Sequence, residues 1–284
     1  MTNSPISDAE LRSLYLDLLK RSLTGAVTQD NDVVLGGVRT QGMKGLKRVA
    51  DLVGRAANKF DFEISYKKAY DPKLRELGQD WPSRSISMVG LKRMQNIEDC
   101  IAAIETDGVE GDFIETGVWR GGSVIFMRGN LKAWGDTTRK VWVADSFEGL
   151  PAPNTKDFPT DAGMIWHEQT GLAVGEQIVR ANFERYGLLD DQVVFLKGWF
   201  KDTLPTAPIE KISLMRLDGD LYESTIQALE ALYPKLQPGG FCIIDDWMLV
   251  DQAQKACHDY RAAHGITEEV IDIDGTGAYW RKAL

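Results

Sequence analysis

The fold is decided by residues 112–123, which read DFIETGVWRGGS. The first five of these residues, which include the apolar pair Phe113 and Ile114, predict a short strand that leads into a turn with three glycines, Gly117, Gly121 and Gly122. A helical pattern follows as far as Trp134. A short apolar run, a glycine-rich turn and a helix in this order are typical of a βαβ unit with a parallel sheet. We therefore expect an α/β fold with a ligand at the carboxyl ends of its strands.

Further apolar runs repeat this alternation along the chain. Besides 112–116, we predict strands at 141–144, 193–196, 212–217 and 241–244, the last of them opened by a turn at 238–240. Two more runs follow, at 270–274 and 278–280, with Gly275-Thr276-Gly277 between them. Two short strands around such a turn indicate a hairpin or an antiparallel edge at the end of the sheet.

Two aspartate pairs follow two of these strands directly. Asp218 and Asp220 come after the fourth predicted strand, and Asp245 and Asp246 come after the fifth. Because the carboxyl ends of parallel strands meet at one edge of a sheet, we expect these carboxylates to converge. Converging carboxylates repel one another, and a hard cation with oxygen ligands (Mg²⁺, Mn²⁺ or Ca²⁺) relieves that repulsion. The alternative is that each pair only caps a helix or ends a strand.

The glycine turn and Asp145 together predict a nucleoside cofactor. Glycines allow a ligand to approach the backbone at the start of a helix. The spacing Gly117-x-x-x-Gly121-Gly122 departs from the dinucleotide pattern, which disfavours a nicotinamide cofactor. Asp145 ends the second predicted strand, where an acid accepts hydrogen bonds from both ribose hydroxyls. The alternative is a tight strand-to-helix turn with a helix-capping aspartate.

Composition is that of a globular protein. The chain has 284 residues, 43% of them hydrophobic, and a net charge of −9, which disfavours a nucleic-acid partner. The three cysteines have no metal-ligand spacing and fit reduced thiols in the cytoplasm. No signal peptide is expected from the sequence that begins Met1-Thr2-Asn3-Ser4-Pro5, and no apolar run is long enough to predict a membrane span.

Several motifs in order resemble the macrocin O-methyltransferase family. They lie at 88–93, 114–122, 143–149, 198–205, 218–220, 243–246 and 279–281, so the resemblance covers about Ser85 to Arg281. Members of this family use S-adenosylmethionine and Mg²⁺ to methylate sugar hydroxyls in the biosynthesis of bacterial natural products such as mycinamicin and novobiocin. The resemblance implies a class I methyltransferase fold, which is Rossmann-like: a seven-stranded, mostly parallel sheet with helices on both faces.

The resemblance also implies roles for individual residues. Glu115, Gly117 and Ser123 line the methionine side of the cofactor. Asp145 and Ser146 hold the ribose, Gly198 and Trp199 border the adenine, and Met88 also contacts the cofactor. The implied metal ligands are Asp218, Asp245 and Asp246. Asp218 and Asp220 are the implied catalytic residues, with Asp220 in the position of a general base.

The chemistry requires an acceptor hydroxyl aligned with the S–CH₃ bond, and a group that takes its proton. From the sequence, that base is Asp220, a carboxylate of the metal cluster, or His167. We expect a glycoside or sugar as substrate. A catechol or phenol methyltransferase of the same fold is the alternative activity, a binding protein without catalysis is a second, and a hydride-transfer enzyme is a more distant one.

The sequence divides into an N-terminal helical extension, 1–85, and a methyltransferase domain, 86–284. The extension opens with a helix capped by Ser7 or Asp8 and followed by Gly25, with an apolar stripe of Leu11, Leu14, Tyr15, Leu18 and Leu19. We expect this region to act as a lid and to form a homodimer or higher homo-oligomer.

A basic segment of the extension has two interpretations. Its cations are Arg39, Lys44, Lys47, Arg48, Arg55 and Lys59, with Asp51 among them. It forms either a solvated helix face or a contact for an anionic substrate or an acidic partner. A role at a membrane surface is disfavoured by its low aromatic content.

The stretch 148–175 is long for a connection between a strand and a helix, and it contains three prolines. Connections of this length at the ligand edge often form lids. Trp166, Trp199 and Trp247 are candidates for stacking on a sugar or on adenine, with packing in the core as the alternative for each.

Overall fold

The computed structural model describes residues 6–36 and 44–284, with the side chain of Leu46 left out. The residues Met1 to Pro5, from which no signal peptide is expected, lie outside the described residues, as does Arg39 of the basic segment.

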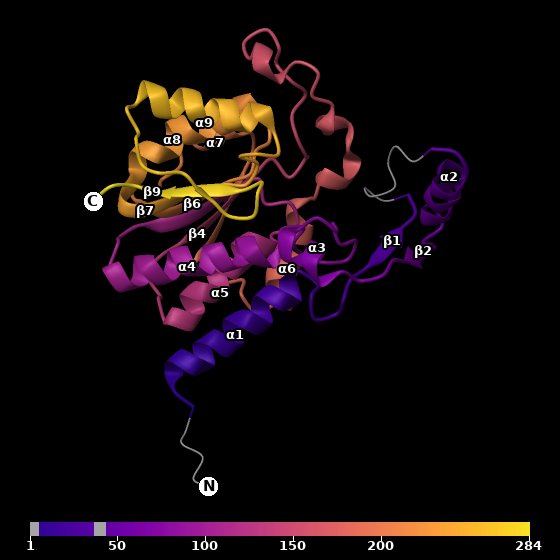
Figure 1. The fold of residues 1–284 in the computed structure, drawn as a ribbon, viewed down its shortest axis with the longest axis horizontal. Coiled ribbons are helices and arrows are strands. Elements are labelled where there is room, and N and C mark those ends of the chain that lie inside the picture. The colour runs from indigo at the N-terminus through magenta and orange to yellow at the C-terminus, as the bar shows by residue number, and fades with distance from the viewer. Residues whose placement is uncertain (1–5, 37–43) are drawn as a thin grey trace.

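A seven-stranded sheet forms the centre of the molecule, with strand order β5-β4-β3-β6-β7-β9-β8 (Figure 1). The strands are β3 (Asp112–Thr116), β4 (Val141–Asp145), β5 (Val193–Lys197), β6 (Ile212–Leu217), β7 (Leu236–Ile244), β8 (Ile271–Asp272) and β9 (Ala278–Arg281). The pairs from β5 to β7 are parallel, whereas β9 runs antiparallel to both β7 and β8. The predicted α/β fold, with a mostly parallel sheet and an antiparallel edge, is confirmed.

Two strands differ from their predicted extents by more than one residue. β7 begins at Leu236, so the predicted turn at 238–240 lies within the strand, where the register against β6 shifts between Ile212 and Leu214. A Pro-Gly-Gly sequence accommodates such an irregularity because it lacks bulky side chains and one ladder donor. β8 is confined to two residues, which is shorter than the predicted run of five.

Helices cover both faces of the sheet (Figure 1). One face carries α4 (Leu91–Asp107), α5 (Gly122–Trp134) and α6 (Glu176–Arg185), and the other carries α7 (Phe200–Thr203), α8 (Tyr222–Leu232) and α9 (Asp251–Ala263). Each face has its own apolar core: Phe126, Ile101 and Phe183 belong to the first, and Leu229, Cys257 and Trp280 to the second. The candidate functional site, described below, lies at the edge of the sheet between these two layers of helices.

Helix α1 (Asp8–Leu23) is part of the first layer. Ser7 caps it and exchanges hydrogen bonds with Glu10 in a capping box, so Ser7 is the cap rather than Asp8. Three of its leucines are buried in the core beneath α4 and α5: Leu16, Leu19 and Leu23. Most of the predicted stripe, by contrast, points outward, because Leu11, Leu14 and Leu18 are exposed.

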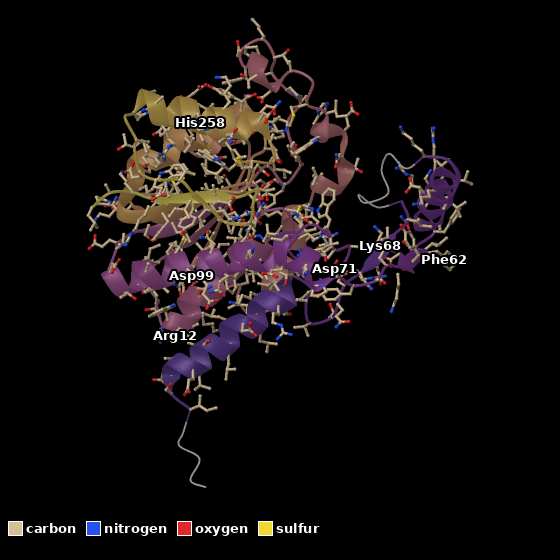
Figure 2. All side chains as sticks on the ribbon, viewed as in Figure 1. Arg12, Phe62, Lys68, Asp71, Asp99 and His258 are labelled. Carbon is tan, nitrogen blue, oxygen red and sulfur yellow. The ribbon has the colours of Figure 1, made fainter. Side chains whose placement is uncertain are left out.

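The remainder of the extension forms an arm that projects from the body (Figure 1). The arm consists of β1 (Asp32–Val34), α2 (Leu46–Asn58) and β2 (Ser65–Lys67), and the antiparallel pair of β1 and β2 connects it to the body. Figure 2 labels Phe62 and Lys68 on this arm. The chain returns to the body through α3 (Pro72–Leu77).

The arm exposes both basic and apolar side chains. Lys44, Lys47, Arg48, Arg55 and Lys59 are exposed, and so are Val49, Leu52, Val53, Phe60 and Phe62. Asp51 is buried and accepts hydrogen bonds from the backbone N–H of Gly36, at 2.7 Å, and from Nε of Arg55, at 2.9 Å. Asp51, the only acid among these cations in the sequence, therefore ties α2 to Gly36, just after β1.

Candidate active site

A cavity of about 750 Å³ lies at the carboxyl ends of the parallel strands. All the residues to which the family resemblance gave a role line it: Met88, Glu115, Gly117, Ser123, Asp145, Ser146, Gly198, Trp199, Asp218, Asp220, Asp245 and Asp246. Residues from the extension (Leu77, Gln79 and Trp81) and from the 148–175 segment (Asn154, Trp166, Gln169 and Leu172) complete the wall. The cavity therefore combines the sheet edge with the two least regular parts of the chain.

The floor of the cavity requires glycine at position 117. Gly117 has a φ of +81°, and a Cβ atom there would lie 1.8 Å from the carbonyl oxygen of Asp218. The backbone N–H of Asp218 donates to the carbonyl of Thr116 at 2.9 Å. The ends of β3 and β6 thus approach so closely that the glycine turn and the Asp218 motif are parts of one structure.

Asp145 joins two loops at the end of β4. Its Oδ2 accepts a hydrogen bond from the backbone N–H of Val118 and its Oδ1 accepts one from that of Phe147, both at 2.7 Å. Burial raises the pKa of Asp145 and these backbone bonds oppose that rise. The carboxylate lines the cavity, and each oxygen retains a lone pair for a ligand.

Arg216 binds three carboxylates beneath the cavity. Its guanidinium donates to Glu115 at 2.5 Å, to Asp218 at 2.9 Å and to Asp245. Glu115 Oε2 is buried without a hydrogen-bond partner, and burial raises the pKa of Glu115 to about 8 although Arg216 lowers it. An unpartnered buried carboxylate oxygen facing a cavity is suited to accept a hydrogen bond from a ligand's amine.

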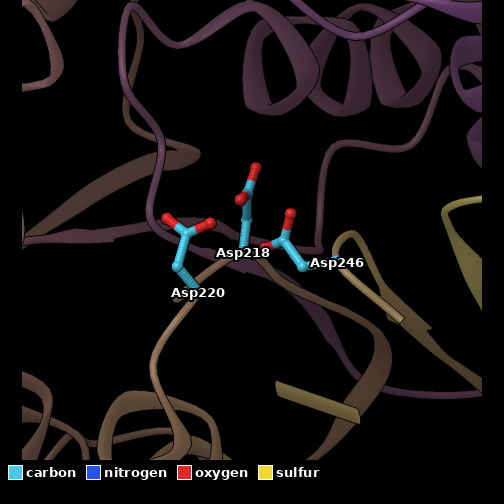
Figure 3. A group of neighbouring side chains, drawn as sticks. All are labelled: Asp218, Asp220 and Asp246. Carbon is cyan, nitrogen blue, oxygen red and sulfur yellow. The ribbon is translucent and has the colours of Figure 1, made fainter. Parts of the chain in front are cut away.

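Asp218, Asp220 and Asp246 form a cluster. One oxygen from each lies within 4.8 Å of the others, and Figure 3 shows the three side chains next to one another. Asp246 Oδ2 is buried without a partner. Burial, and then the neighbouring carboxylates, raise the pKa of Asp218 to about 6, that of Asp220 to about 8, and that of Asp246 well above its ordinary value. This donor set, all oxygen and short of positive charge, fits a hard divalent cation.

Asp245 has a different environment from these three. Its Oδ1 accepts from Arg216 and its Oδ2 from Arg93 on α4. Burial raises the pKa of Asp245, but Arg216 and Arg93 lower it more, so its pKa falls below the ordinary value. Arg93 also binds Asp274 at 2.8 Å and the hydroxyl of Thr276. Asp245 is thereby held between α4, β6 and the β8–β9 turn.

The comparisons with known proteins agree with this geometry. The family described as Macrocin-O-methyltransferase (TylF) matches residues 12–282. This chain belongs to the macrocin O-methyltransferase family. Its relatives include the 8-demethyl-8-(2,3-dimethoxy-alpha-L-rhamnosyl)-tetracenomycin-C 4'-O-methyltransferase of Streptomyces olivaceus, 50% identical over 96% of this chain and 94% of that protein. They also include the mycinamicin III 3''-O-methyltransferase of Micromonospora griseorubida, 44% identical over 99% of each chain.

A solved structure supports the same assignment. The O-methyltransferase NovP superposes with a TM-score of 0.81 at 41% identity, over 96% of this chain and all of that one. The macrocin O-methyltransferase resemblance expected from the sequence is confirmed. The chain is an S-adenosylmethionine-dependent O-methyltransferase with a class I fold. Among residues 6–36 and 44–284, no helix combines the length and the apolar character that crossing a membrane requires.

The sequence patterns did not predict a role for two arginines of this methyltransferase site, Arg216 and Arg93. Arg216 lies in β6, whose six residues are all buried. A charged residue in such a strand signals carboxylate partners, because an unpaired buried charge is costly. Arg93 gave a weaker signal, since its helix also carries exposed charges and its partners lie far along the chain.

Of the other residues that the sequence suggested for the site, some line the cavity and some do not. Trp166 and Trp199 line the methyltransferase cavity. Trp247 instead packs against His258 and Trp280 in the second core. His167 is exposed and is not among the residues that line the cavity.

Proposed function

We propose that this enzyme transfers a methyl group from S-adenosylmethionine to a sugar hydroxyl of a bacterial natural product, with Mg²⁺ as cofactor. The observation that carries the proposal is the cluster of Asp218, Asp220 and Asp246 in the same cavity as Glu115 and Asp145. The names of two relatives support a sugar acceptor, since one is a 4'-O-methyltransferase of a rhamnosyl tetracenomycin and another a 3''-O-methyltransferase of mycinamicin III.

We assign the donor to the β3–β4–β5 side of the cavity. Glu115, through its unpartnered oxygen, would accept from the amine of the methionine part, next to Gly117 and Ser123. Asp145 and Ser146 would bind the ribose hydroxyls. Gly198 and Trp199 would border the adenine, and Met88, which also lines the cavity, would contact the cofactor. Because the Gly117 turn lies against the backbone of Asp218, a donor held there would supply its methyl group beside the aspartate cluster.

We assign Asp218, Asp245 and Asp246 to Mg²⁺ and Asp220 to the acceptor hydroxyl. The lowered pKa of Asp245 keeps it ionised, and its oxygens retain lone pairs beside the two guanidinium groups. Burial and the carboxylates of Asp218 and Asp245 raise the pKa of Asp220 to about 8. The positive charge of a bound Mg²⁺ would lower that pKa, so that Asp220 would be ionised and able to take a proton near neutral pH. A ligand set of Asp218, Asp220 and Asp246 is the competing assignment, because these three oxygens cluster.

The residues of the chain then have separate tasks in the reaction. The two halves of the cavity hold the donor and the acceptor hydroxyl in line, which removes most of the entropic barrier. Asp220 would take the proton of that hydroxyl as the hydroxyl oxygen bonds to the methyl carbon. The S–CH₃ bond would break at the same time, and the donor would leave as the neutral thioether S-adenosylhomocysteine. Mg²⁺, when bound, supplies positive charge that stabilises the developing alkoxide. Arg216 and Arg93 keep the surrounding carboxylates fixed.

We further propose that the enzyme is a cytoplasmic homodimer or higher homo-oligomer. Its three cysteines are buried free thiols, as is usual in a reducing compartment. Exposed leucines on α1 and exposed apolar side chains on the arm offer surfaces that a second copy can cover.

Mass spectrometry tests the activity directly. The enzyme is incubated with S-adenosylmethionine, Mg²⁺ and two acceptor panels, glycosylated natural products and simple catechols. We expect a gain of one methylene on the glycosides, at a hydroxyl of the sugar. Methylation of the catechols alone would show that the acceptor is a phenol and not a sugar.

A further inference from the structure

Asp220 lies in a strained turn. Its φ is +59°, although it is not glycine. The backbone N–H of Leu221 donates to the carbonyl of Gly219 at 2.6 Å, which closes a three-residue γ-turn around Asp220. γ-Turns with a positive φ at the central residue are rare and strained, and such a residue keeps its conformation only when the surrounding structure enforces it.

Asp161 holds the chain immediately after this turn. Its Oδ1 accepts from the backbone N–H of Tyr222 at 2.7 Å, and its Oδ2 accepts from that of Glu223 at 3.0 Å. These are the first two residues of α8, whose N-cap residue, Leu221, provides no side-chain hydrogen bond. Asp161 is 0% exposed. A carboxylate from 61 residues earlier in the chain therefore caps the helix that starts two residues after Asp220.

The segment that carries Asp161 is the long 148–175 connection, and it has a second anchor across the cavity. The carbonyl of Gly171 accepts from Nε1 of Trp119 at 3.0 Å. Trp119, in the cofactor turn, is another non-glycine residue with a positive φ, +48°. The segment thus lines the cavity between two anchors, one on the strained residue Trp119 and the other on the two residues that follow the Asp220 turn.

We propose that Asp161 is a positioning residue for Asp220, an inference that rests on the proposed role of Asp220 as the base. By binding the Tyr222 and Glu223 amides, Asp161 fixes where α8 begins and so maintains the γ-turn that directs Asp220 into the cavity. Without Asp161 the turn relaxes toward an ordinary negative φ, and the carboxylate of Asp220 swings away from the acceptor. The 148–175 segment must therefore be seated against α8 for the base to be in place.

A double-mutant cycle tests this coupling. The variants are Asp161→Ala, Asp220→Asn and the double variant, and turnover of a glycoside acceptor and calorimetric S-adenosylmethionine affinity are measured for each. We expect Asp161→Ala to lower kcat by about 10–100-fold, because a displacement of about 1 Å is enough for such a loss. Its effect on cofactor affinity should stay within about twofold, and kcat should not fall further in the Asp220→Asn background.

The outcomes separate this inference from the proposed function. If Asp161→Ala lowers kcat by the same factor in both backgrounds, Asp161 does not act through Asp220, and the inference is wrong while the function stands. Wild-type turnover by Asp220→Asn would instead show that Asp220 is not the base. Both the proposed mechanism and this inference would then be wrong.

Two further variants keep the test decisive. Asp161→Asn retains one acceptor oxygen, so we expect an intermediate kcat, and it replaces Asp161→Ala in the cycle if the alanine variant does not fold. Ser7→Ala is the matched control, since it removes the cap of α1 far from the cavity. It should lower stability without changing kcat. An equal loss of kcat in Ser7→Ala and Asp161→Ala would reduce the role of Asp161 to helix stability.

Discussion

Arg216 and Glu115 form an ion pair of 2.5 Å beneath the cavity, where neither side chain is more than 2% exposed. Because Arg216 also binds Asp218 and Asp245, one guanidinium balances carboxylates from β3, from the β6 end and from the β7 end. Glu115 is assigned to the donor and Asp218 to the metal. The two halves of the proposed site therefore share one buried cation.

Replacing that cation should destabilise the whole protein. We expect Arg216→Met to lower the free energy of unfolding by about 3–5 kcal/mol, because it leaves buried carboxylates without a partner. Arg216→Lys should lose less, since it keeps the charge but not the forked geometry. Urea unfolding measures both. The control is Arg21→Met, whose ion pair with Asp17 is exposed and which should stay within about 0.5 kcal/mol of wild type. Equal stability of Arg216→Met and Arg21→Met would contradict the prediction.

Removal of the metal should abolish turnover. EDTA leaves the carboxylates of Asp218, Asp245 and Asp246 without a counter-charge, so we expect activity to vanish and Mg²⁺ to restore it. Mg²⁺ should also raise the melting temperature of the wild-type enzyme, because it binds only the folded state. Asp246→Asn should lose both effects while remaining folded. Full activity in EDTA would take the metal out of the mechanism.

Asp145 should govern cofactor affinity. We expect Asp145→Ala to weaken S-adenosylmethionine binding by about 1–3 kcal/mol, through loss of a charged acceptor for the ribose hydroxyls. Asp145→Asn keeps an acceptor for one of the two loop amides and helps to separate ribose binding from loop order. Asp191→Ala, an exposed site at the other end of β5, is the control. Calorimetry that finds unchanged affinity in Asp145→Ala would leave Asp145 as a structural cap.

Substitutions of Asp218 and of Asp220 should impair the enzyme in different ways. Asp218→Asn should weaken Mg²⁺ binding and be partly rescued by excess Mg²⁺. Asp220→Asn should retain Mg²⁺ and cofactor binding but lower kcat by about 10²–10⁴-fold, the usual range for a lost general base. Isothermal titration and steady-state kinetics distinguish the two. Weakened Mg²⁺ binding in Asp220→Asn, with normal binding in Asp245→Asn, would establish the competing ligand set.

The exposed face of α1 should matter for assembly. Leu14 is 61% exposed on that face, between Leu11 and Leu18. We expect Leu14→Glu to shift the protein from an oligomer to a monomer in sedimentation velocity, because a charge in an apolar interface is costly to bury. Lys132→Gln, on α5, is the charge-matched control, because it also makes the net charge one unit more negative and Lys132 is exposed. An unchanged sedimentation coefficient in Leu14→Glu would show that the interface does not include this face of α1.

Sequence patterns predicted the parts of the site that depend on local rules. A strand, a glycine turn and an aspartate at a strand end can each be recognised from adjacent residues. They lie around one cavity because the carboxyl ends of parallel strands meet at the same edge of the sheet. The contacts of Asp161 and Arg93 were not predictable in this way. Each is an ordinary charged residue in its own segment, and its partners follow 61 residues later for Asp161 and 152 or more later for Arg93.

The extension was harder to read for a similar reason. The apolar pattern of α1 is ambiguous because leucines occur on both of its faces, and only packing against α4 and α5 decides that Leu16, Leu19 and Leu23 are inside. Arg216 was overlooked because its strand reads as apolar. A single arginine there changes the electrostatics of the entire site without disturbing the period of the pattern.

The burial of α1 bears on how this enzyme can be engineered. A shortened chain that begins at residue 86 would strip three leucines from the first core and remove Trp81 and Gln79 from the cavity wall. Chimeras that exchange acceptor preference between relatives are therefore best joined inside the arm, around β1 and β2, where the crossover disturbs neither the first core nor the cavity lining. We therefore expect foreign sequence to be tolerated best in the arm.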